Sequence, residues 1–433
     1  MAKPETWPDH QHHLDRRMTL ARQWDDLVAE VRELPGFTDF LRPPSLESLL
    51  PAAADGPVVV INVSRWRCDA LLVTTGGVDV VELGSLTYPE IINRIAAYLE
   101  TVDRFQDVTL ALTSASEQYR AGALDDEGMR GAVQTYELDM IDLEQRLSLV
   151  LEWCWEHVTE PVLTRLGFTA PPGGDRWPRL WWCPTGLLTL LPLHAAGRHE
   201  TPGESVIERV VSSYTPTLRA LLEARRPPPT AEEDSAVRDA LLVVAMPQTP
   251  GQPALPNVAR EVALLTGLDG LGSTVLQGPG ATVDAVREAL SGHRWVHFAC
   301  HGDQNLDDPA QGGVLLTDGM LTVTDISARQ YHSDLAYLSA CKTATGGTTL
   351  PDEAITLAAA LHYTGYRHVI ATLWSIWDDT APTVAESVYR SLADGAMLRP
   401  ERSAVALHHA VRALRADRLG EPSVWMPYTH TGP

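Results

Sequence analysis

Two residues that could carry out nucleophilic catalysis each follow an apolar, strand-like run. His301 follows the run 295–300, and Cys341 follows the run 335–340. Since neighbouring parallel strands end at the same edge of a sheet, we expect the imidazole and the thiol to face one crevice. A thiol with an ordinary pKa of about 8.5 is mostly protonated at neutral pH, and a nearby imidazole can accept its proton. The pair therefore predicts Cys341 as nucleophile and His301 as base.

Backbone N–H groups beside both residues could form an oxyanion hole. Gly302 has no side chain, so its N–H can approach a developing oxyanion closely, and the N–H of Cys341 would be the second donor. Losing one such donor typically raises the barrier by about 3 kcal/mol. After the nucleophile, the Thr-rich loop 343–349 contains Gly346-Gly347, and we expect this loop to move on activation.

Cys183 is a rival nucleophile, because it also ends a short apolar strand. Pro184 follows it directly and has no N–H with which to hold an oxyanion, so we favour a structural role. A single histidine or cysteine at a strand end is more often a packing residue, and only the pairing of His301 with Cys341 favours catalysis. Cys300 should alternate to the opposite face of its strand, into the core, and His297 is also expected to be buried.

Composition and charge exclude several classes of function. The chain has 433 residues and a formal net charge of -22, which argues against direct binding of nucleic acid. Its five cysteines lack CxxC spacing, so we expect neither a disulfide framework nor a metal site, and no cofactor. The N-terminus is polar and no run approaches eighteen apolar residues. We therefore expect a cytoplasmic protein that does not contact a membrane.

The order of predicted elements indicates an α/β fold. Apolar strands at 58–63, 69–73 and 78–82 form a meander, followed by helices at 88–102 and about 136–165. After the Pro-rich and acidic linker, strands and amphipathic helices alternate, which indicates a mostly parallel sheet covered on both faces. The predicted units are a helical segment and linker (1–56), an N-terminal half (57–225), a linker (226–235) and a C-terminal half (236–433).

Several motifs resemble those of the CHAT domain family, which contains caspase-like and separase-like cysteine peptidases. The motifs are His-Phe-Ala-Cys-His-Gly (297–302), Leu-Ser-Ala-Cys-Lys-Thr (338–343), Asp352-Glu353, the run 371–380 and Trp425-Met426-Pro427-Tyr428. The resemblance covers roughly 57–433. It implies a three-layer caspase-like fold in which a degenerate N-terminal half packs on an active C-terminal half.

The resemblance also implies an activity. His301 and Cys341 would cleave a peptide bond in a protein substrate, and a partner protein or upstream module would activate the chain. Defence or cell-death signalling is a setting suggested by analogy alone. One alternative is a catalytically silent CHAT fold that acts as a scaffold or signalling module. A nucleotide-binding protein and a serine hydrolase find little support, because neither GxxxxGK[ST] nor GxSxG occurs.

Substrate specificity remains open at this stage. Arginine-directed relatives often carry an acidic residue two positions before the cysteine, where this chain has Ser339. A preference for a basic residue before the cleaved bond would then need other carboxylates: Asp352, Glu353, Asp378 or Asp379. The first two could instead favour a helix N-terminus. We expect Trp374, Ser375 and the residues up to Asp379 to line the substrate groove.

Overall fold

The computed structural model describes residues 7–37, 40–174, 176–226, 238–346 and 355–433. The chain divides into two compact units, Met1–Pro51 and Ala52–Pro433. The first unit contains α1 (Trp7–Arg32) and α2 (Leu46–Leu49). In α1, the apolar side chains of Leu20, Trp24 and Leu27 are exposed. The second unit carries all the residues expected to act chemically.

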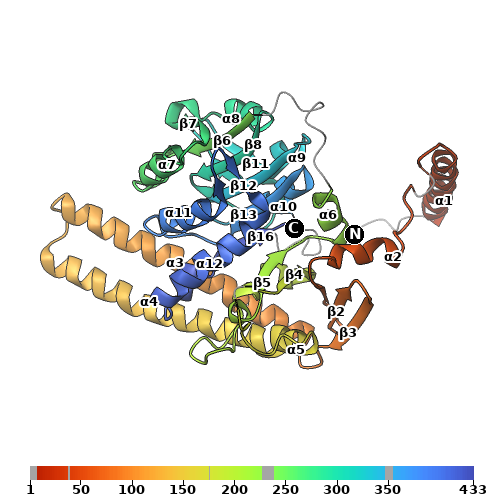
Figure 1. The fold of residues 1–433 in the computed structure, drawn as a ribbon, viewed down its shortest axis with the longest axis horizontal. Coiled ribbons are helices and arrows are strands. Elements are labelled where there is room, and N and C mark those ends of the chain that lie inside the picture. Colours follow the sequence, from red (N-terminus) through yellow and green to blue (C-terminus); the bar gives the residue numbers. More distant parts are fainter. Residues whose placement is uncertain (1–6, 38–39, 175, 227–237, 347–354) are drawn as a thin grey trace. The chain divides into compact units, whose positions relative to one another are not determined.

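Within the described residues of the second unit, eleven strands form one sheet in the order β3-β2-β1-β4-β5-β16-β13-β12-β8-β6-β7 (Figure 1). The strands are β1 (Val58–Asn62), β2 (Asp69–Thr74), β3 (Gly77–Glu82), β4 (Arg179–Pro184), β5 (Val211–Tyr214), β6 (Arg238–Ala245), β7 (Gly272–Gln277), β8 (His293–Ala299), β12 (Ser333–Ser339), β13 (Tyr366–Thr372) and β16 (Tyr428–Thr431). The predicted antiparallel meander is β1–β3. Most other neighbours are parallel, so the predicted mostly parallel α/β sheet is confirmed.

The two faces of the sheet bury two separate apolar clusters. Along β8, Trp295 and Ala299 pack on one side, whereas Val296 and Phe298 pack on the other. Helices of the first side are α7 (Val258–Thr266), α11 (Ala381–Leu392) and α12 (Ser403–Asp417); those of the second are α8 (Val283–Leu290), α9 (Val323–Ser327) and α10 (Leu357–Tyr363). Successive side chains along a strand point to opposite faces of the sheet, so a sheet covered by helices on both faces has one apolar cluster on each side.

Helix starts follow the capping rules. The Thr282 hydroxyl accepts from the Ala285 N–H at 3.2 Å and caps α8. Thr356 caps α10, which therefore begins at Leu357, later than the residues 352–353 that were considered for a helix N-terminus. Side-chain oxygens at these positions satisfy N–H groups that have no partner within the helix.

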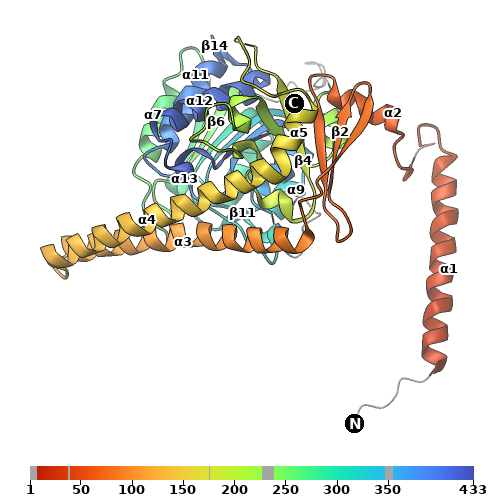
Figure 2. The ribbon, with the colours of Figure 1, turned by 90° about the horizontal axis from the view of Figure 1, so that it is seen from below.

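Two long helices form an antiparallel hairpin, α3 (Tyr88–Arg120) and α4 (Asp126–Cys154). The predicted helices at 88–102 and 136–165 were wrong in their bounds: α3 is longer, α4 starts earlier, and residues 155–159 form one π-helical turn before α5 (Glu160–Arg165). Figure 2 shows the hairpin along one side of the sheet with its tip extending past the sheet. Its inner residues, among them Phe105 and Leu147, pack into the first apolar cluster.

The strand β16 lies between strands from the two predicted halves. It pairs antiparallel with β13 and parallel with β5, where Thr431 is opposite Tyr214. The residues before linker 226–235 and those after it therefore share one sheet. The division into a degenerate half (57–225) and a peptidase half (236–433) stays a prediction.

None of the helices in the described part of the chain is long and apolar enough to cross a membrane. The described residues also contain no group of three or more His, Cys, Asp or Glu side chains arranged to hold a metal ion.

Candidate active site

His301 and Cys341 line the same pocket. The strands β8 and β12 are parallel neighbours, with Ala299 opposite Ser339. Each candidate catalytic residue lies two positions beyond one member of this pair, so the two lie at the same edge of the sheet. The pocket between them has a volume of about 340 Å³.

A backbone carbonyl fixes the orientation of the His301 ring. Its Nε2 lies 2.8 Å from the carbonyl oxygen of Pro253. A carbonyl can only accept a hydrogen bond, so Nε2 carries the proton and, in the neutral ring, Nδ1 has the free lone pair. The ring is thus held in the tautomer that can accept a proton at Nδ1. The sequence reasoning missed this contact, because a main-chain carbonyl has no sequence signature.

The Cys341 thiol is partly exposed to the pocket. Burial raises its pKa, while hydrogen bonds from the Ile376 backbone and the Ser375 side chain and the charge of Lys342 oppose that increase. Among the hydrogen bonds of the described residues, none joins Cys341 to His301. The raised pKa favours the thiol over the thiolate.

Gly302 lies directly against the backbone of Cys341. A Cβ atom at position 302 would lie 2.4 Å from the Cys341 carbonyl oxygen and 3.2 Å from its nitrogen. Residues 302–303 form β9, which pairs antiparallel with β10 (Gly313–Leu315), and the Leu315 N–H donates to the His301 carbonyl at 2.8 Å. Because hydrogen-bonded pairs alternate along such a ladder, the Gly302 N–H points away from β10.

The turn after Cys341 is held by two buried hydroxyls. Thr372 Oγ1 donates to the Ala340 carbonyl at 2.6 Å, and Thr343 Oγ1 donates to it at 3.2 Å. The N–H of Cys341 belongs to the same trans peptide, so it points away from both threonines. Lys342 then has a φ of 57°, in the left-handed region that a lysine rarely adopts. The described part of loop 343–349 is thus well anchored, and residues 347–349 lie outside the description.

Most of the predicted substrate-binding residues line this pocket, namely Ser339, Trp374, Ser375 and Asp378. Ser339 and Trp374 are buried. The Asp378 carboxylate accepts from both the backbone N–H and the side-chain amide of Asn257, at 3.1 and 2.7 Å. Asp379 instead lines a neighbouring groove. Asp352 and Glu353 lie outside the described residues.

The helix α3 supplies one wall of the pocket, which sequence reasoning did not predict. The lining residues from this helix are Val102, Phe105, Gln106, Thr109 and Leu110. On the same helix, the Asp103 carboxylate lies 3.9 Å from the ammonium of Lys342, the residue after Cys341. The segment 57–225 thus helps to build the site, and only the amphipathic pattern of α3 could have indicated that it packs here.

The rival residues occupy structural positions. Cys183 is buried and its thiol donates to the Pro216 carbonyl at 3.5 Å, with burial raising its pKa to about 12. Cys300 is buried among apolar residues of the second cluster, and burial raises its pKa. The ring of His297 is fully buried between Glu261 and Tyr389, 3.2 Å from each.

A large, mostly parallel sheet with helices on both faces and a His–Cys pair at one edge defines a caspase-like fold. Two comparisons support this class. The sequence profile of the CHAT domain family matches residues 149–433, about two thirds of the chain. The chain belongs to the CHAT domain family.

Among solved structures, the chain is similar in fold to separase in the Saccharomyces cerevisiae separase–securin complex. The TM-score is 0.60 at 8% identity, and the match covers 89% of this chain and 30% of that separase chain. It is also similar to two structures of the Arg-specific cysteine proteinase RgpB of Porphyromonas gingivalis, each with a TM-score of 0.42, at 12% and 13% identity, with coverage of 64% of this chain and 69% and 68% of those chains. The chain thus spans less than a third of the separase it matches. No curated protein matches the chain in sequence.

Proposed function

We propose that the chain is a cysteine endopeptidase that cleaves protein substrates, with Cys341 as nucleophile and His301 as general base. The observation that carries this proposal is the shared pocket, in which the Pro253 carbonyl leaves Nδ1 of His301 as the basic atom. A cysteine–imidazole pair at one edge of the sheet is the arrangement that acyl transfer from a peptide bond requires.

In the proposed reaction, Nδ1 of His301 takes the Cys341 proton and Sγ attacks the peptide carbonyl carbon. The N–H groups of Gly302 and Cys341 donate to the resulting oxyanion. The C–N bond breaks and the leaving amine takes the proton from the imidazolium, which leaves a thioester on Cys341. Water, deprotonated by His301, attacks the thioester and releases the carboxylic acid, and the thiol regains its proton.

The site supports activation by a partner or an upstream module. The Cys341 thiol has hydrogen bonds with the Ile376 backbone and the Ser375 side chain, and none with His301 among the described residues. A change that brings it to Nδ1 of His301 would start the reaction. The helix α3 lines the pocket and approaches Lys342, so displacement of α3 would also move the nucleophile's turn.

Ser339, Trp374, Ser375 and Asp378 are proposed to contact the substrate, because they line the same pocket as Cys341. Asp378 is the carboxylate among them, and its two hydrogen bonds from Asn257 already hold it in place. A basic side chain before the cleaved bond would therefore form an ion pair with the Asp378 carboxylate, whose position is already fixed in the absence of substrate.

The test is covalent labelling with a library of peptide electrophiles that vary in the residue next to the warhead. Wild type is compared with Cys341→Ala and with the matched control Cys183→Ala. We expect labelling in wild type and Cys183→Ala, with a preference for one class of side chain, and loss of labelling in Cys341→Ala. Wild-type protein that stays unlabelled, with and without candidate activators, would contradict the proposal and favour a silent scaffold.

A further inference from the structure

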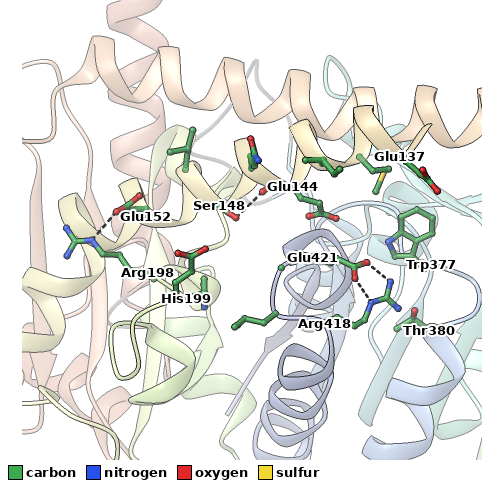
Figure 3. Close-up of a pocket in the computed structure, with 18 of the residues that line it drawn as sticks. Glu137, Glu144, Ser148, Glu152, Arg198, His199, Trp377, Thr380, Arg418 and Glu421 are labelled. Atoms are coloured by element: carbon green, nitrogen blue, oxygen red, sulfur yellow. Dashed lines mark hydrogen bonds and ion pairs between the residues drawn. The ribbon is translucent and has the colours of Figure 1, made fainter. Parts of the chain in front are cut away.

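A second, larger cavity lies beside the catalytic pocket. We call it the α4 groove: it runs between α4, from Tyr136 to Glu152, and the segments 197–201, 377–380 and 418–421 (Figure 3). Its volume is about 1240 Å³. At a rise of 1.5 Å per residue, this part of α4 is about 24 Å long, enough for a helix of about 16 residues or an extended segment of about seven.

The α4 groove is strongly acidic. Six carboxylates line it: Glu137, Glu144, Glu152, Glu200, Asp379 and Glu421. Both cations in its lining already have carboxylate partners, since Arg198 pairs with Glu152, Glu156 and Glu204, and Arg418 pairs with Glu421. Among the described residues, Glu137, Glu200 and Asp379 form no ion pair. A cationic occupant would therefore meet carboxylates that lack a cationic partner.

Exposed apolar side chains also line the α4 groove. Ile141, Leu149 and Leu419 line it with exposed fractions of 57%, 58% and 43%. Ile141 and Leu149 are eight residues apart on α4, so they lie on the same face of the helix. Exposed apolar residues gathered in a concave surface mark a site of protein contact. The combination fits a polypeptide segment with both basic and apolar side chains.

The α4 groove adjoins the catalytic pocket. Trp377 lines both cavities. The buried Glu144 carboxylate of the groove accepts hydrogen bonds from the backbone and the hydroxyl of Ser423. Ser423 lines the catalytic pocket, and its carbonyl accepts from Trp374 Nε1 at 3.3 Å. The two cavities are therefore close enough for two segments of one polypeptide to occupy them together.

We propose that the α4 groove docks a cationic, apolar segment of the protein substrate while another segment of that substrate is cleaved at Cys341. This inference rests on the proposed peptidase function. Because Trp377 lines both cavities, a substrate bound at Cys341 is favoured as the occupant over a separate activator or a second copy of the chain. The acidic lining excludes nucleic acid and anionic lipid surfaces as occupants.

Binding is tested by fluorescence anisotropy on the full chain carrying Cys341→Ala, which cannot turn over the probe. The probes are three labelled peptides of about 16 residues: an amphipathic Arg/Leu peptide, the same peptide with Glu for Arg, and the same with Ser for Leu. The groove variant is Glu137→Arg with Glu200→Arg. The matched control is Glu117→Arg with Glu127→Arg, two exposed carboxylates outside the groove lining that give the same change in net charge.

We expect the Arg/Leu peptide to bind most tightly and the groove variant to weaken it by about tenfold or more, while the control variant changes its affinity less than twofold. Equal binding of the Arg and Glu peptides, or equal losses in the two variants, would overturn the proposal. Sedimentation shows whether the chain self-associates, and a dimer lost only in the groove variant would make the groove a dimer interface instead.

The substrate role is tested with a cleavable peptide, made with and without the Arg/Leu segment on a flexible linker. With Cys341 present, we expect kcat/KM for the longer peptide to exceed that for the shorter one by at least tenfold, and this advantage to disappear in the groove variant. Equal cleavage despite tight binding would assign the groove to an activator and overturn the proposal. Absence of both cleavage and electrophile labelling would reject the proposed peptidase function. The anisotropy measurements would still show whether the α4 groove binds a cationic, apolar peptide.

Discussion

Replacing Gly302 by alanine is expected to remove most of the proposed activity without unfolding the chain. The new Cβ would lie 2.4 Å from the Cys341 carbonyl oxygen, and an ordinary contact begins near 3.4 Å. The two backbones must therefore separate by about 1 Å. A displacement of this size at a reacting centre, or the loss of one oxyanion donor, lowers the rate about 100-fold, or about 2.7 kcal/mol in barrier height.

The assay compares two reactions of the same thiol in the Gly302→Ala variant. Hydrolysis of the best peptide found by labelling passes through an oxyanion, whereas alkylation by iodoacetamide does not. We expect kcat/KM for hydrolysis to fall about 100-fold and the alkylation rate to change only a few-fold. Gly280→Ala is the control, since nothing lies within 4 Å of a Cβ there. Hydrolysis by Gly302→Ala within threefold of wild type would refute the oxyanion-hole argument.

Three further predictions concern the thiol, the α4 groove and the nucleophile's turn. Iodoacetamide should modify Cys341 before the four buried cysteines, as peptide mapping will show, and earlier modification of Cys183 would contradict this. The rate should rise with pH because the thiolate is the reacting form, and burial, which raises the pKa of this thiol, moves that rise to higher pH than for a free cysteine. Burial raises the pKa of Glu144 from 4.5 to about 7, so its carboxyl stabilises the fold most below about pH 4.5 and this contribution is lost as the pH rises through 7. In urea unfolding, the free energy of unfolding of Glu144→Gln should therefore increase by up to about 3 kcal/mol relative to that of wild type between pH 4.5 and 8. A difference that does not change with pH would disprove the raised pKa of Glu144. Thr343→Val should cost about 1–3 kcal/mol in free energy of unfolding, since the Thr372 N–H that donates to its hydroxyl loses its partner; an unchanged urea midpoint would count against that contact.

The convergence of His301 and Cys341 could be predicted because it follows from two local patterns. Each residue follows an apolar run with strand character, and parallel strands end at one edge. The sequence also shows directly that position 302 is a glycine, which has no side chain. Its distance from Cys341 depends on the pairing of β9 with β10, which no local pattern gives.

Other parts of the site could not be predicted, for physical reasons. The Pro253 carbonyl is a main-chain group, and any residue type could present it. The wall formed by α3 comes from more than two hundred residues before Cys341, so its contribution depends on long-range packing. Asp378 and Asp379 are adjacent in sequence, yet they line different cavities.

The strand β16 shows the same limit in the fold. Its sequence Tyr-Thr-His-Thr (428–431) is short and carries little apolar character, so no strand was predicted there. Tertiary pairing with β13 and β5 determines its conformation, as is common for strands, whose propensity depends on context.

The central place of β16 has a consequence for biosynthesis. In chain order it is the last strand of the eleven, yet in space it separates β5 from β13. A nascent polypeptide can bring β8 and β12 together before it contains the strand that joins them to β5. A product terminated before Tyr428 would keep an open, apolar edge at β13, and such edges recruit strands from other molecules. Premature termination is therefore expected to yield aggregates and not a smaller folded domain.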